Sequence, residues 1–568
     1  MFTRRQWIVI LSLIVLGASF RIAVVRAWPN DDQGDSAIYS QLARNMLEHH
    51  VYSSETEAPY TPTYARVPGY PIFLAGIYAV FGHTNNAAVR IVQALIDTGS
   101  CVIVALLAFY WQPNKKRKRA TAIAALALAA INPFTTIYVA TILTEVPTIF
   151  LCLAAVLAAT LALEAADQKR SLLLSMLSGL FAAAATMFRP DSGLLVVLLG
   201  LVMFTVALVR TKKISLHSVA LAGTVALAFA VTLAPWTIRN WRVFRAWQPL
   251  APSNATMPGG FYPSGYERWL KTWVGDTDYN EGFWWSLNDK KINVDDLPDE
   301  AFDSPAEHDR IKTLFDQYNK TAPNDQDDTN DASRPELSPA PVTPSPTNNA
   351  NNNRPSSTKQ SNGNVNTNSN SEDADDEQSD QDEDQKDAQA QKDDQDSDKE
   401  KEESSPNAPG EMTPEIDAAF GQIAAERIAR NRLRYYVLLP ARRAHAMWFN
   451  THSDLYPFDG NLFPLDDLDH TTHQHIWLPL FAGIVALYTI LGVVGWVIML
   501  NTPNGYARAW AIFLGLMIVS RLVLLSTLVS PEPRYVILFF PFLSITGSIA
   551  IVSALAMRGR WRAAVESE

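Results

Sequence analysis

Long apolar runs alternate with polar segments over most of this chain. Runs of about 17–25 apolar residues are long enough to cross the hydrocarbon core of a bilayer as helices. By that criterion we predict roughly ten membrane-spanning helices, namely Trp7–Val25, Ala87–Trp111, Ala120–Ala140, Val146–Leu163, Leu172–Phe188, Gly193–Val209, Val219–Trp236, Ile476–Leu500, Ala509–Val529 and Tyr535–Met557. The predicted fold class is therefore an all-α polytopic membrane protein, because a spanning helix pairs its own backbone polar groups.

Basic residues in the short connections predict the orientation of these helices. Short loops rich in Lys and Arg stay on the cytoplasmic side of a membrane. Five basic clusters fall on one side of the bundle, at positions 4–5, 115–119, 169–170, 210–213 and 558–562. Only the connection that carries Arg508 is weakly basic. We therefore predict an integral, multi-pass protein of the plasma (inner) membrane with both termini in the cytoplasm.

One segment accounts for the acidity of the whole chain. The formal net charge is -11, but 22 of the 58 acidic residues and 7 of the 47 basic residues lie within positions 321–410. That stretch consists of Asn, Ser, Asp, Gln, Glu and Pro with almost no large apolar side chains. Because it cannot bury enough apolar surface to offset the entropy of ordering, we predict a disordered insert. The remainder of the chain is slightly basic.

These features divide the chain into five predicted parts. They are a membrane core with spans 1–7 and a first outer loop (1–250, loop 28–86), an outer aromatic-rich segment (251–320), the disordered acidic Asn/Ser-rich insert (321–410), an outer helical segment (411–475) and spans 8–10 (476–568). The outer domain is therefore small. Cys101 and Cys152 both lie in apolar runs, which excludes a disulfide framework and favours buried thiols.

Charged residues far apart in the sequence lie at the outer ends of the predicted spans or in the outer loops. They are Asp35, Arg66, Glu145, Arg189, Asp191, Arg239, Glu532 and Arg534. Ionisable groups at membrane depth are costly and are candidates for function. The alternative is that such charges only end the spans. Arg21, near the outer end of the first span, is expected to extend its head group to the interface.

Asp35 is the candidate general base. It precedes a stripe of apolar residues at helical spacing, which predicts an amphipathic helix lying on the membrane. The stripe consists of Ile38, Leu42 and Met46. A helix N-terminus favours an ionised carboxylate, and such a group can accept a proton from a hydroxyl. The alternative is an ordinary helix cap, and Asp31 and Asp32 are rival candidates.

Glu145 and four arginines are candidate binding residues. Glu145 lies between Pro133 and Pro147, which predict a broken helix where the carboxylate could bind a divalent cation or orient an acceptor; the alternative is a solvated residue at the start of a span. Arg66, Arg189, Arg239 and Arg534 suit phosphate, because a guanidinium bonds two oxygens and stays charged. The alternative for each arginine is contact with lipid head groups.

Other kinds of site have little support in this sequence. The spacing of His470, His473 and His475 fits no standard zinc pattern. The chain has no P-loop, no dinucleotide-binding glycine fingerprint and no nucleophile elbow. We therefore expect no soluble nucleotide as the direct donor and no nucleic-acid partner.

Several segments together resemble the C-type glycosyltransferases, which are polytopic enzymes that use polyprenyl-phosphate sugars. The segments are GDSAIYSQLARNML, RVPGYPIFLAGIYAVFG, NAAVRIVQALIDTGSCVIVALLA, NPFTTIYVATILTEVPTIF, MFRPDSGLL, LAPWTIRNWRVF and SPEPRYVILFFPFL. The likeness is to the protein O-mannosyltransferase and lipid A aminoarabinose-transferase branch. It implies an inverting displacement in which Asp35 is the base, Glu145 is the acid of the second outer loop and arginines bind the departing phosphate.

The resemblance also leaves alternatives open. The first outer loop carries a single acid in GDS, without the acidic pair of the protein mannosyltransferases, so the acceptor is a lipid, a glycan or a protein. A polymerase or ligase that uses a lipid-linked oligosaccharide fits nearly as well. A transporter or flippase would place ionisable groups near the bilayer midplane, where this sequence has only Asp97 and Arg521. A structural or sensory protein that displays an acidic arm would not explain the segments around Asp35 and Arg66.

Overall fold

The computed structural model describes residues 2–27, 34–82, 84–211, 215–252, 256–257, 260–277, 279–320, 410–458, 460 and 472–565. Within these ranges nine helices are long and apolar enough to cross a membrane. They are α1 (Arg4–Ala27), α4 (Asn86–Trp111), α7 (Glu145–Glu164), α8 (Gln168–Phe188), α9 (Leu194–Thr211) with the 3-10 turn η2 (Pro190–Gly193) before it, α10 (Leu216–Phe244), α15 (Gln474–Leu500), α16 (Gly505–Leu525) and α17 (Phe539–Val565). The predicted fold class is confirmed.

A tenth candidate span is broken. Helix α5 (Lys118–Ala130) is followed by α6 (Pro133–Thr136) and the 3-10 turn η1 (Ile137–Ala140), and the two parts are bent by 52°. Asn132 starts the second part, because its side chain accepts hydrogen bonds from the backbone N–H groups of Phe134 and Thr135. The prediction of a broken helix near Pro133 agrees with this bend.

The expectation that Arg21 reaches the membrane interface is wrong. Its side chain is 0% exposed and its Nε lies 2.7 Å from Oδ2 of Asp97, which is also buried. The guanidinium also donates to the carbonyl oxygens of Gly17, Ala129 and Ala130 at 3.0–3.3 Å. Arg21 therefore satisfies the last carbonyls of α5 at the break in this span, which the helix itself leaves without donors.

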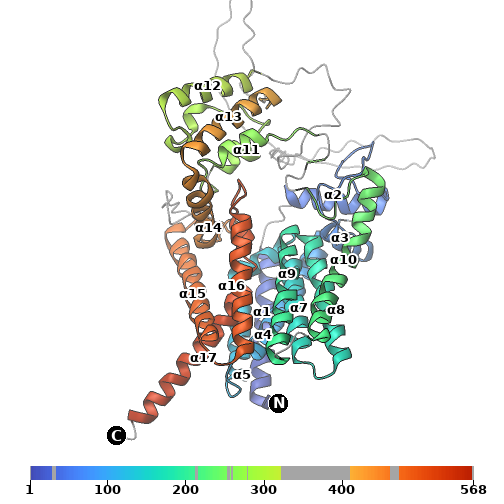
Figure 1. Ribbon diagram of the computed structural model, residues 1–568, viewed down its shortest axis with the longest axis vertical. Helices are drawn as coiled ribbons and strands as arrows, with labels where there is room; N and C mark the ends of the chain where they lie inside the picture. The colour runs from blue at the N-terminus through green and yellow to red at the C-terminus, as the bar shows by residue number, and fades with distance from the viewer. Residues whose placement is uncertain are drawn as a thin grey trace, which may run out of the picture. The chain divides into compact units, whose positions relative to one another are not determined.

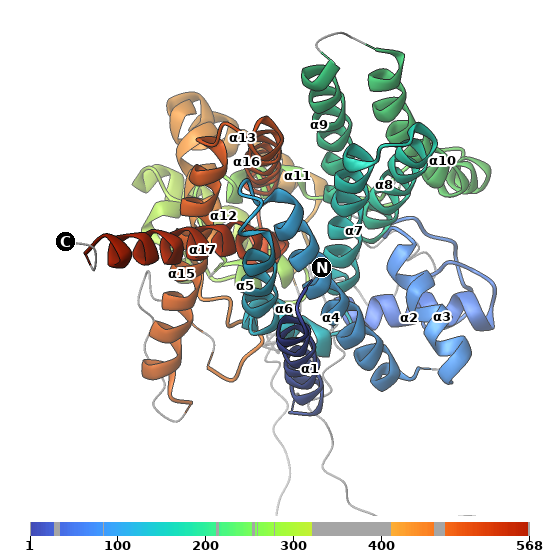
Figure 2. The ribbon, with the colours of Figure 1, turned by 90° about the horizontal axis from the view of Figure 1, so that it is seen from below.

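The spanning helices pack through close contacts of small residues. Figure 1 shows α7, α8, α9 and α10 side by side, and Figure 2 shows α5 against α1 and α4. A Cβ added at Gly495 of α15 would lie 1.7 Å from the carbonyl oxygen of Thr546 in α17. One at Gly179 of α8 would lie 2.3 Å from that of Val225 in α10. Such approaches increase the van der Waals contact between helices in lipid. Cys101 and Cys152 are buried free thiols, as predicted.

The first loop forms two further helices, α2 (Asp35–Glu48) and α3 (Gly69–Phe81). The apolar stripe of α2 packs on protein and not flat on the membrane, because Leu42 is fully buried against Met187 of α8 and Trp236 of α10. Ile38 and Met46 pack against the same cluster. The helix was predicted correctly, but the partner of its apolar face was not, since lipid and protein partners require the same spacing.

The outer segments form a helical unit with an aromatic core. Its helices are α11 (Ser264–Leu270), α12 (Pro305–Tyr318), α13 (Pro414–Arg430) and α14 (Leu439–Phe449), with π-helical turns η3 (Glu281–Trp285) and η6 (Arg434–Leu438) and short 3-10 turns η4 (Val294–Asp296) and η5 (Asp299–Ala301). Trp269, Phe315 and Phe420 are buried at its centre. Helices α11, α12 and α13 interlock because each contributes large rings to this core, whereas Met447 of α14 packs in the core of the membrane helices.

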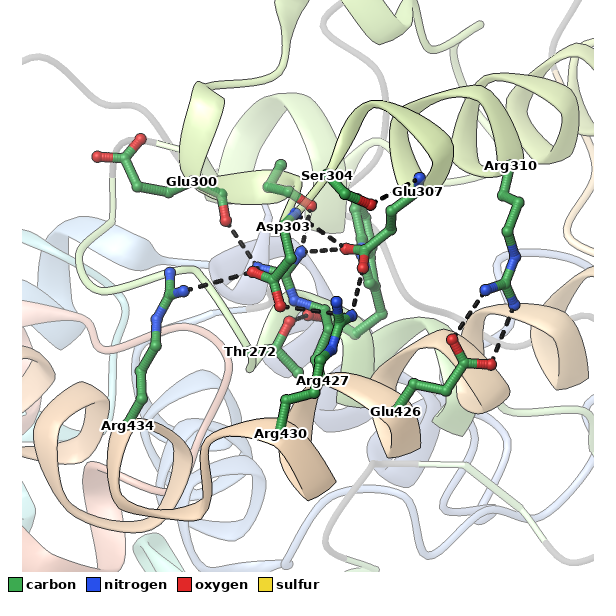
Figure 3. A network of polar contacts seen from close by, with 12 residues as sticks. Thr272, Glu300, Asp303, Ser304, Glu307, Arg310, Glu426, Arg427, Arg430 and Arg434 are labelled. Atoms are coloured by element: carbon green, nitrogen blue, oxygen red, sulfur yellow. Dashed lines mark hydrogen bonds and ion pairs between the residues drawn. The ribbon is translucent and has the colours of Figure 1, made fainter.

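An ion-pair network joins α12 to α13 beside this core (Figure 3). Arg427 pairs with Asp303 at 3.1 Å and with Glu307, and Arg430 pairs with Glu307 at 2.5 Å. Arg434 also pairs with Asp303 and so joins the network. The two segments that flank the acidic insert in the sequence are thus held together by partly buried charges.

Removal of residues 325–405 is expected to leave the outer unit folded. The ends of the insert are already joined, since the backbone N–H of Glu411 donates to the carbonyl oxygen of Tyr318 at 3.2 Å. The N–H of Met412 also donates to the side chain of Asn288. A shorter connection loses less entropy on closure, by about 2 kcal/mol for this change in length. Thermal unfolding of the purified deletion variant should show an equal or higher midpoint, and a lower midpoint would contradict the prediction.

Candidate functional site

Asp35 meets two arginines from distant parts of the chain. It is the first residue of α2, and the cap position before it is occupied by Gly34 at a φ of 58°, so Asp35 is not the helix cap. Arg66 donates from Nη2 to Oδ1 of Asp35 at 3.4 Å, and Arg534 donates from Nη2 to Oδ2 at 3.2 Å. The carboxylate remains 30% exposed. A reactant could therefore reach it.

The close approach of α3 to α8 brings Arg66 to this position. A Cβ at Gly69 would lie 2.4 Å from the carbonyl oxygen of Met187, so only glycine fits this crossing. The hydroxyl of Tyr52 donates to the carbonyl oxygens of Arg66 and Val67 at 3.2 Å. The Arg–Val–Pro–Gly sequence is thus a rigid connection that holds Arg66 at the end of α8.

Arg534 belongs to a compact group on the 3-10 turn η7 (Pro533–Val536), just before α17. Its Nε pairs with Oε2 of Glu532, and its Nη2 donates to Oε1 of the same carboxylate at 3.2 Å. The hydroxyl of Tyr535 also donates to Oε1, at 2.6 Å. Glu532 therefore binds the side chains of both Arg534 and Tyr535 in the turn.

A second group of charges surrounds Glu145. Arg189 donates from Nη1 to Oε1 of Glu145 at 2.7 Å and lies 3.5 Å from Asp191. Arg521 of α16 approaches the other oxygen of Asp191 at 2.5 Å. Glu145 is only 4% exposed, and its Oε2 has no hydrogen-bond partner among the described residues. A buried carboxylate oxygen without a donor is costly, which makes Oε2 of Glu145 a candidate to accept a hydrogen bond from a ligand.

Tyr535 links the two groups. The guanidinium of Arg189 lies over its ring at 5.1 Å from the centroid, and that of Arg534 lies at 5.7 Å. The resulting charge cluster consists of Asp35, Arg66, Glu145, Arg189, Asp191, Arg521, Glu532, Arg534 and Tyr535. It lies where α7 and α17 begin and where α8 and α16 end. These ends meet at one face because consecutive spans alternate in direction.

The charge cluster keeps Asp35 ionised. Burial acts to raise the pKa of this carboxyl, but the charges of Arg534 and Arg66 outweigh burial and hold the pKa below its ordinary value. Burial and the adjacent Glu532 raise the pKa of Tyr535, so its phenol stays protonated and can donate. Asp35 is thus a carboxylate at neutral pH, in a setting of positive charge that also suits an anionic ligand.

Arg239 lies in a different environment from the other predicted arginines. It donates to the carbonyl oxygen of Thr63 at 2.7 Å and lies over the rings of Tyr52, Trp236 and Phe244. No contact recorded for the described residues joins it to the charge cluster. Its nearest link is Tyr52, whose hydroxyl holds the backbone of Arg66. The structure therefore gives Arg239 a supporting position behind the first loop.

The described residues include no group of three His, Cys, Asp or Glu side chains arranged to hold a metal ion. Glu145, the candidate cation ligand, offers one unpartnered oxygen beside an arginine. This arrangement is not a complete ligand set, and no step below depends on a metal. The rival acids Asp31 and Asp32 and the candidate His470 lie outside the described residues.

The charge cluster also contains residues to which the sequence assigned no individual role. Asp191 and Glu532 are visible in the sequence as charges at span ends, and Arg521 as a charge within a span. Tyr535 carries no such signal, although it lies in the quoted segment SPEPRY. Their shared location follows only from the packing of α8, α16 and η7.

One protein-family model matches part of the chain. Residues 63–236 match the family model described as dolichyl-phosphate-mannose-protein mannosyltransferase. The matched part covers α3 to most of α10 and includes Arg66, Glu145 and Arg189. The predicted resemblance to polytopic C-type membrane glycosyltransferases is thereby confirmed.

One solved structure is also similar, and no curated protein sequence matches the chain. The structure is the archaeal oligosaccharyltransferase AglB from Archaeoglobus fulgidus, in complex with an inhibitory peptide and a dolichol-phosphate. The sequence identity is 12%, the TM-score is 0.45, and the match covers 100% of this chain and 52% of the other. The chain thus spans about half the length of that protein, and a likeness at this level establishes no shared activity.

Proposed function

We propose that this protein transfers a sugar from a polyprenyl-phosphate donor to a hydroxyl of a lipid, glycan or protein acceptor at the outer membrane face. The observation that carries the proposal is the meeting of Asp35, Arg66 and Arg534. An ionised, partly exposed carboxylate lies between two arginines at the end of the membrane spans. Sugar transfer from a lipid phosphate requires a base and groups that bind phosphate, and Asp35 with its two arginines supports both roles.

The reaction is an inverting displacement. Asp35 takes the proton of the acceptor hydroxyl as its oxygen forms a bond to the anomeric carbon. The bond from that carbon to the phosphate oxygen breaks, and the polyprenyl phosphate leaves with the electron pair. Arg66 and Arg534, with Arg189 nearby, stabilise the negative charge on the departing phosphate. Groups shielded from water act more strongly on that charge than they would in bulk solvent.

Glu145 has a separate role in this proposal. Its buried Oε2 lacks a donor among the described residues, and a hydroxyl of the sugar or of the acceptor would supply one. Arg189 holds the other oxygen and fixes the carboxylate. Glu145 therefore orients a reactant by hydrogen bonding, and the loss of its charge should matter less than the loss of the base.

The orientation in the membrane follows from the basic connections. All five basic clusters lie at the ends of the spans opposite to the charge cluster in the sequence order. We therefore expect the charge cluster on the non-cytoplasmic side of the plasma membrane. Cysteines introduced singly into the 321–410 segment of a variant without native cysteines should react with a membrane-impermeant reagent in intact cells. Reaction only after cell lysis would show that the segment lies in the cytoplasm and that the predicted topology is wrong.

The activity can be tested with purified protein in vesicles that contain a radiolabelled polyprenyl-phosphate sugar and extracted membrane acceptors. Transfer of label to an acceptor is expected. Movement of the donor between leaflets without transfer would favour a flippase, and use of only lipid-linked oligosaccharides would favour a polymerase or ligase. Mass spectrometry of envelope glycolipids and glycoproteins from a deletion strain, beside the parent, would identify the sugar and the acceptor.

Arg66→Gln is expected to make transfer sensitive to mild acid. In the parent, the depressed pKa of Asp35 keeps the base ionised. The rate of transfer should therefore stay unchanged as the pH falls to about 4, which is near the ordinary pKa of an aspartate. Loss of Arg66 leaves burial less opposed, so the pKa of Asp35 rises and the rate begins to fall at a higher pH than in the parent. Rates of transfer between pH 4 and 8 check this, and an unchanged profile would contradict it.

A further inference from the structure

Arg534 is shared between two carboxylates. Its Nη2 lies 3.2 Å from Oδ2 of Asp35 and 3.2 Å from Oε1 of Glu532. Its Nε also forms an ion pair with Oε2 of Glu532. The guanidinium therefore does not form a forked pair with Asp35, although that is the stronger arrangement for Arg and a carboxylate. Asp35 receives a hydrogen bond from only one nitrogen of this guanidinium, and that nitrogen also donates to Glu532.

Residues of one short turn keep Arg534 between the carboxylates of Asp35 and Glu532. Tyr535 donates to the same Oε1 of Glu532 that accepts from Arg534 Nη2, which fixes the direction of that carboxylate. The ring of Tyr535 is held by the guanidinium of Arg189. Glu532 is mostly buried, with 15% of its side chain exposed. The turn therefore presents Arg534 to Asp35 in one fixed geometry.

We propose that Glu532 is a positioning residue of the transferase, which with Tyr535 keeps Arg534 from closing onto Asp35 and leaves that carboxylate free to bind the acceptor hydroxyl. This inference rests on the proposed function, because it assigns Glu532 a task only if Asp35 acts as the base. Without Glu532, Arg534 would carry an uncompensated charge and turn both of its outer nitrogens to Asp35. The base would then be weaker and its oxygens occupied.

Several charged or titratable groups lie near Asp35, so a test of Glu532 must separate its effect from theirs. Arg66 faces it from the loop before α3 and Arg534 from η7. Tyr39 lies on the same helix, and burial and the charge of Asp35 raise the pKa of its phenol. Glu145 acts on Arg534 from α7 at longer range. Because the parental pKa of Asp35 is already depressed, a further decrease is best measured in the Arg66→Gln protein, where the acid limb of the rate profile is expected at higher pH.

The experiment compares Arg66→Gln with Arg66→Gln/Glu532→Gln and Arg66→Gln/Glu532→Asp in the vesicle transfer assay. Glu532→Gln should move the acid limb of kcat/KM to lower pH by about one unit and lower kcat about tenfold, since a stronger pair with Arg534 weakens the base. Glu532→Asp keeps the charge and should keep the acid limb near that of Arg66→Gln. An unmoved limb with Glu532→Gln would overturn the proposal, because a merely structural role would lower the rate equally at every pH.

A second variant covers the case in which Glu532→Gln does not fold. Tyr535→Phe in the Arg66→Gln background removes the hydroxyl that fixes Glu532 but leaves every charge in place. It should lower kcat severalfold while the acid limb moves by less than with Glu532→Gln, and full parental kcat would contradict the role of the turn. Failure here is distinct from failure of the proposed function, which would appear as transfer by Asp35→Asn with the native Glu532 present.

Discussion

Asp35→Asn is expected to lower the rate of sugar transfer by at least about a hundredfold, because general base catalysis contributes on the order of 10²–10⁴-fold. Asparagine keeps the shape of the side chain and one acceptor oxygen for Arg66 or Arg534, so the local fold should persist. It cannot take a proton from a hydroxyl at neutral pH. The measurement is label transfer from a polyprenyl-phosphate sugar in vesicles, at equal amounts of purified, monodisperse protein.

Two sets of variants serve as controls for Asp35→Asn. Asp31→Asn and Asp32→Asn change neighbouring acids of the same loop and should retain near-parental turnover. Glu145→Gln should lower the rate by less than Asp35→Asn, since an amide can still accept a hydrogen bond. If Asp35→Asn is active while Asp31→Asn or Asp32→Asn is not, the base is misassigned. If all three are active, the reaction does not take place at this loop.

Asp97→Leu is expected to destabilise the membrane domain by about 3–5 kcal/mol, the cost of leaving one member of a buried ion pair uncompensated. Arg21 would then remain as a charge within the bundle, and a guanidinium cannot lose its proton to relieve this. Its contacts to the carbonyls of Ala129 and Ala130 would persist but would not neutralise it. The thermal unfolding midpoint of the purified protein in detergent should fall clearly.

The double variant Arg21→Leu/Asp97→Leu should recover part of this loss. It removes both charges, but it also leaves the last carbonyls of α5 without a donor, so recovery should be incomplete. Glu426→Gln is the matched control, because Glu426 pairs with Arg310 at an exposed position and such pairs contribute about 0–1 kcal/mol. A midpoint of Asp97→Leu equal to that of this control would mean that the buried pair does not stabilise the bundle.

Local sequence was sufficient to predict the membrane-spanning helices of this fold. The thickness of a bilayer fixes the length of an apolar run that crosses it, so the spans could be counted without knowledge of their neighbours. The break near Pro133 followed from a residue that cannot continue a helix. Asp35, Glu145 and three of the four candidate arginines were chosen because they stood at span ends, and the structure brings these five into one charge cluster. Charges at span ends are conspicuous because apolar residues surround them.

Pairing between distant elements was decided only by the tertiary structure. Arg534 meets Asp35 across 499 positions, and Arg21 meets Asp97 across 76. A charge at a span end looks the same whether it faces lipid head groups, a ligand or another side chain, which is why Arg21 was assigned to the interface and Arg239 was grouped with the other arginines. The packing of helices distinguished these cases, because it alone determines which charges share a space from which water is excluded.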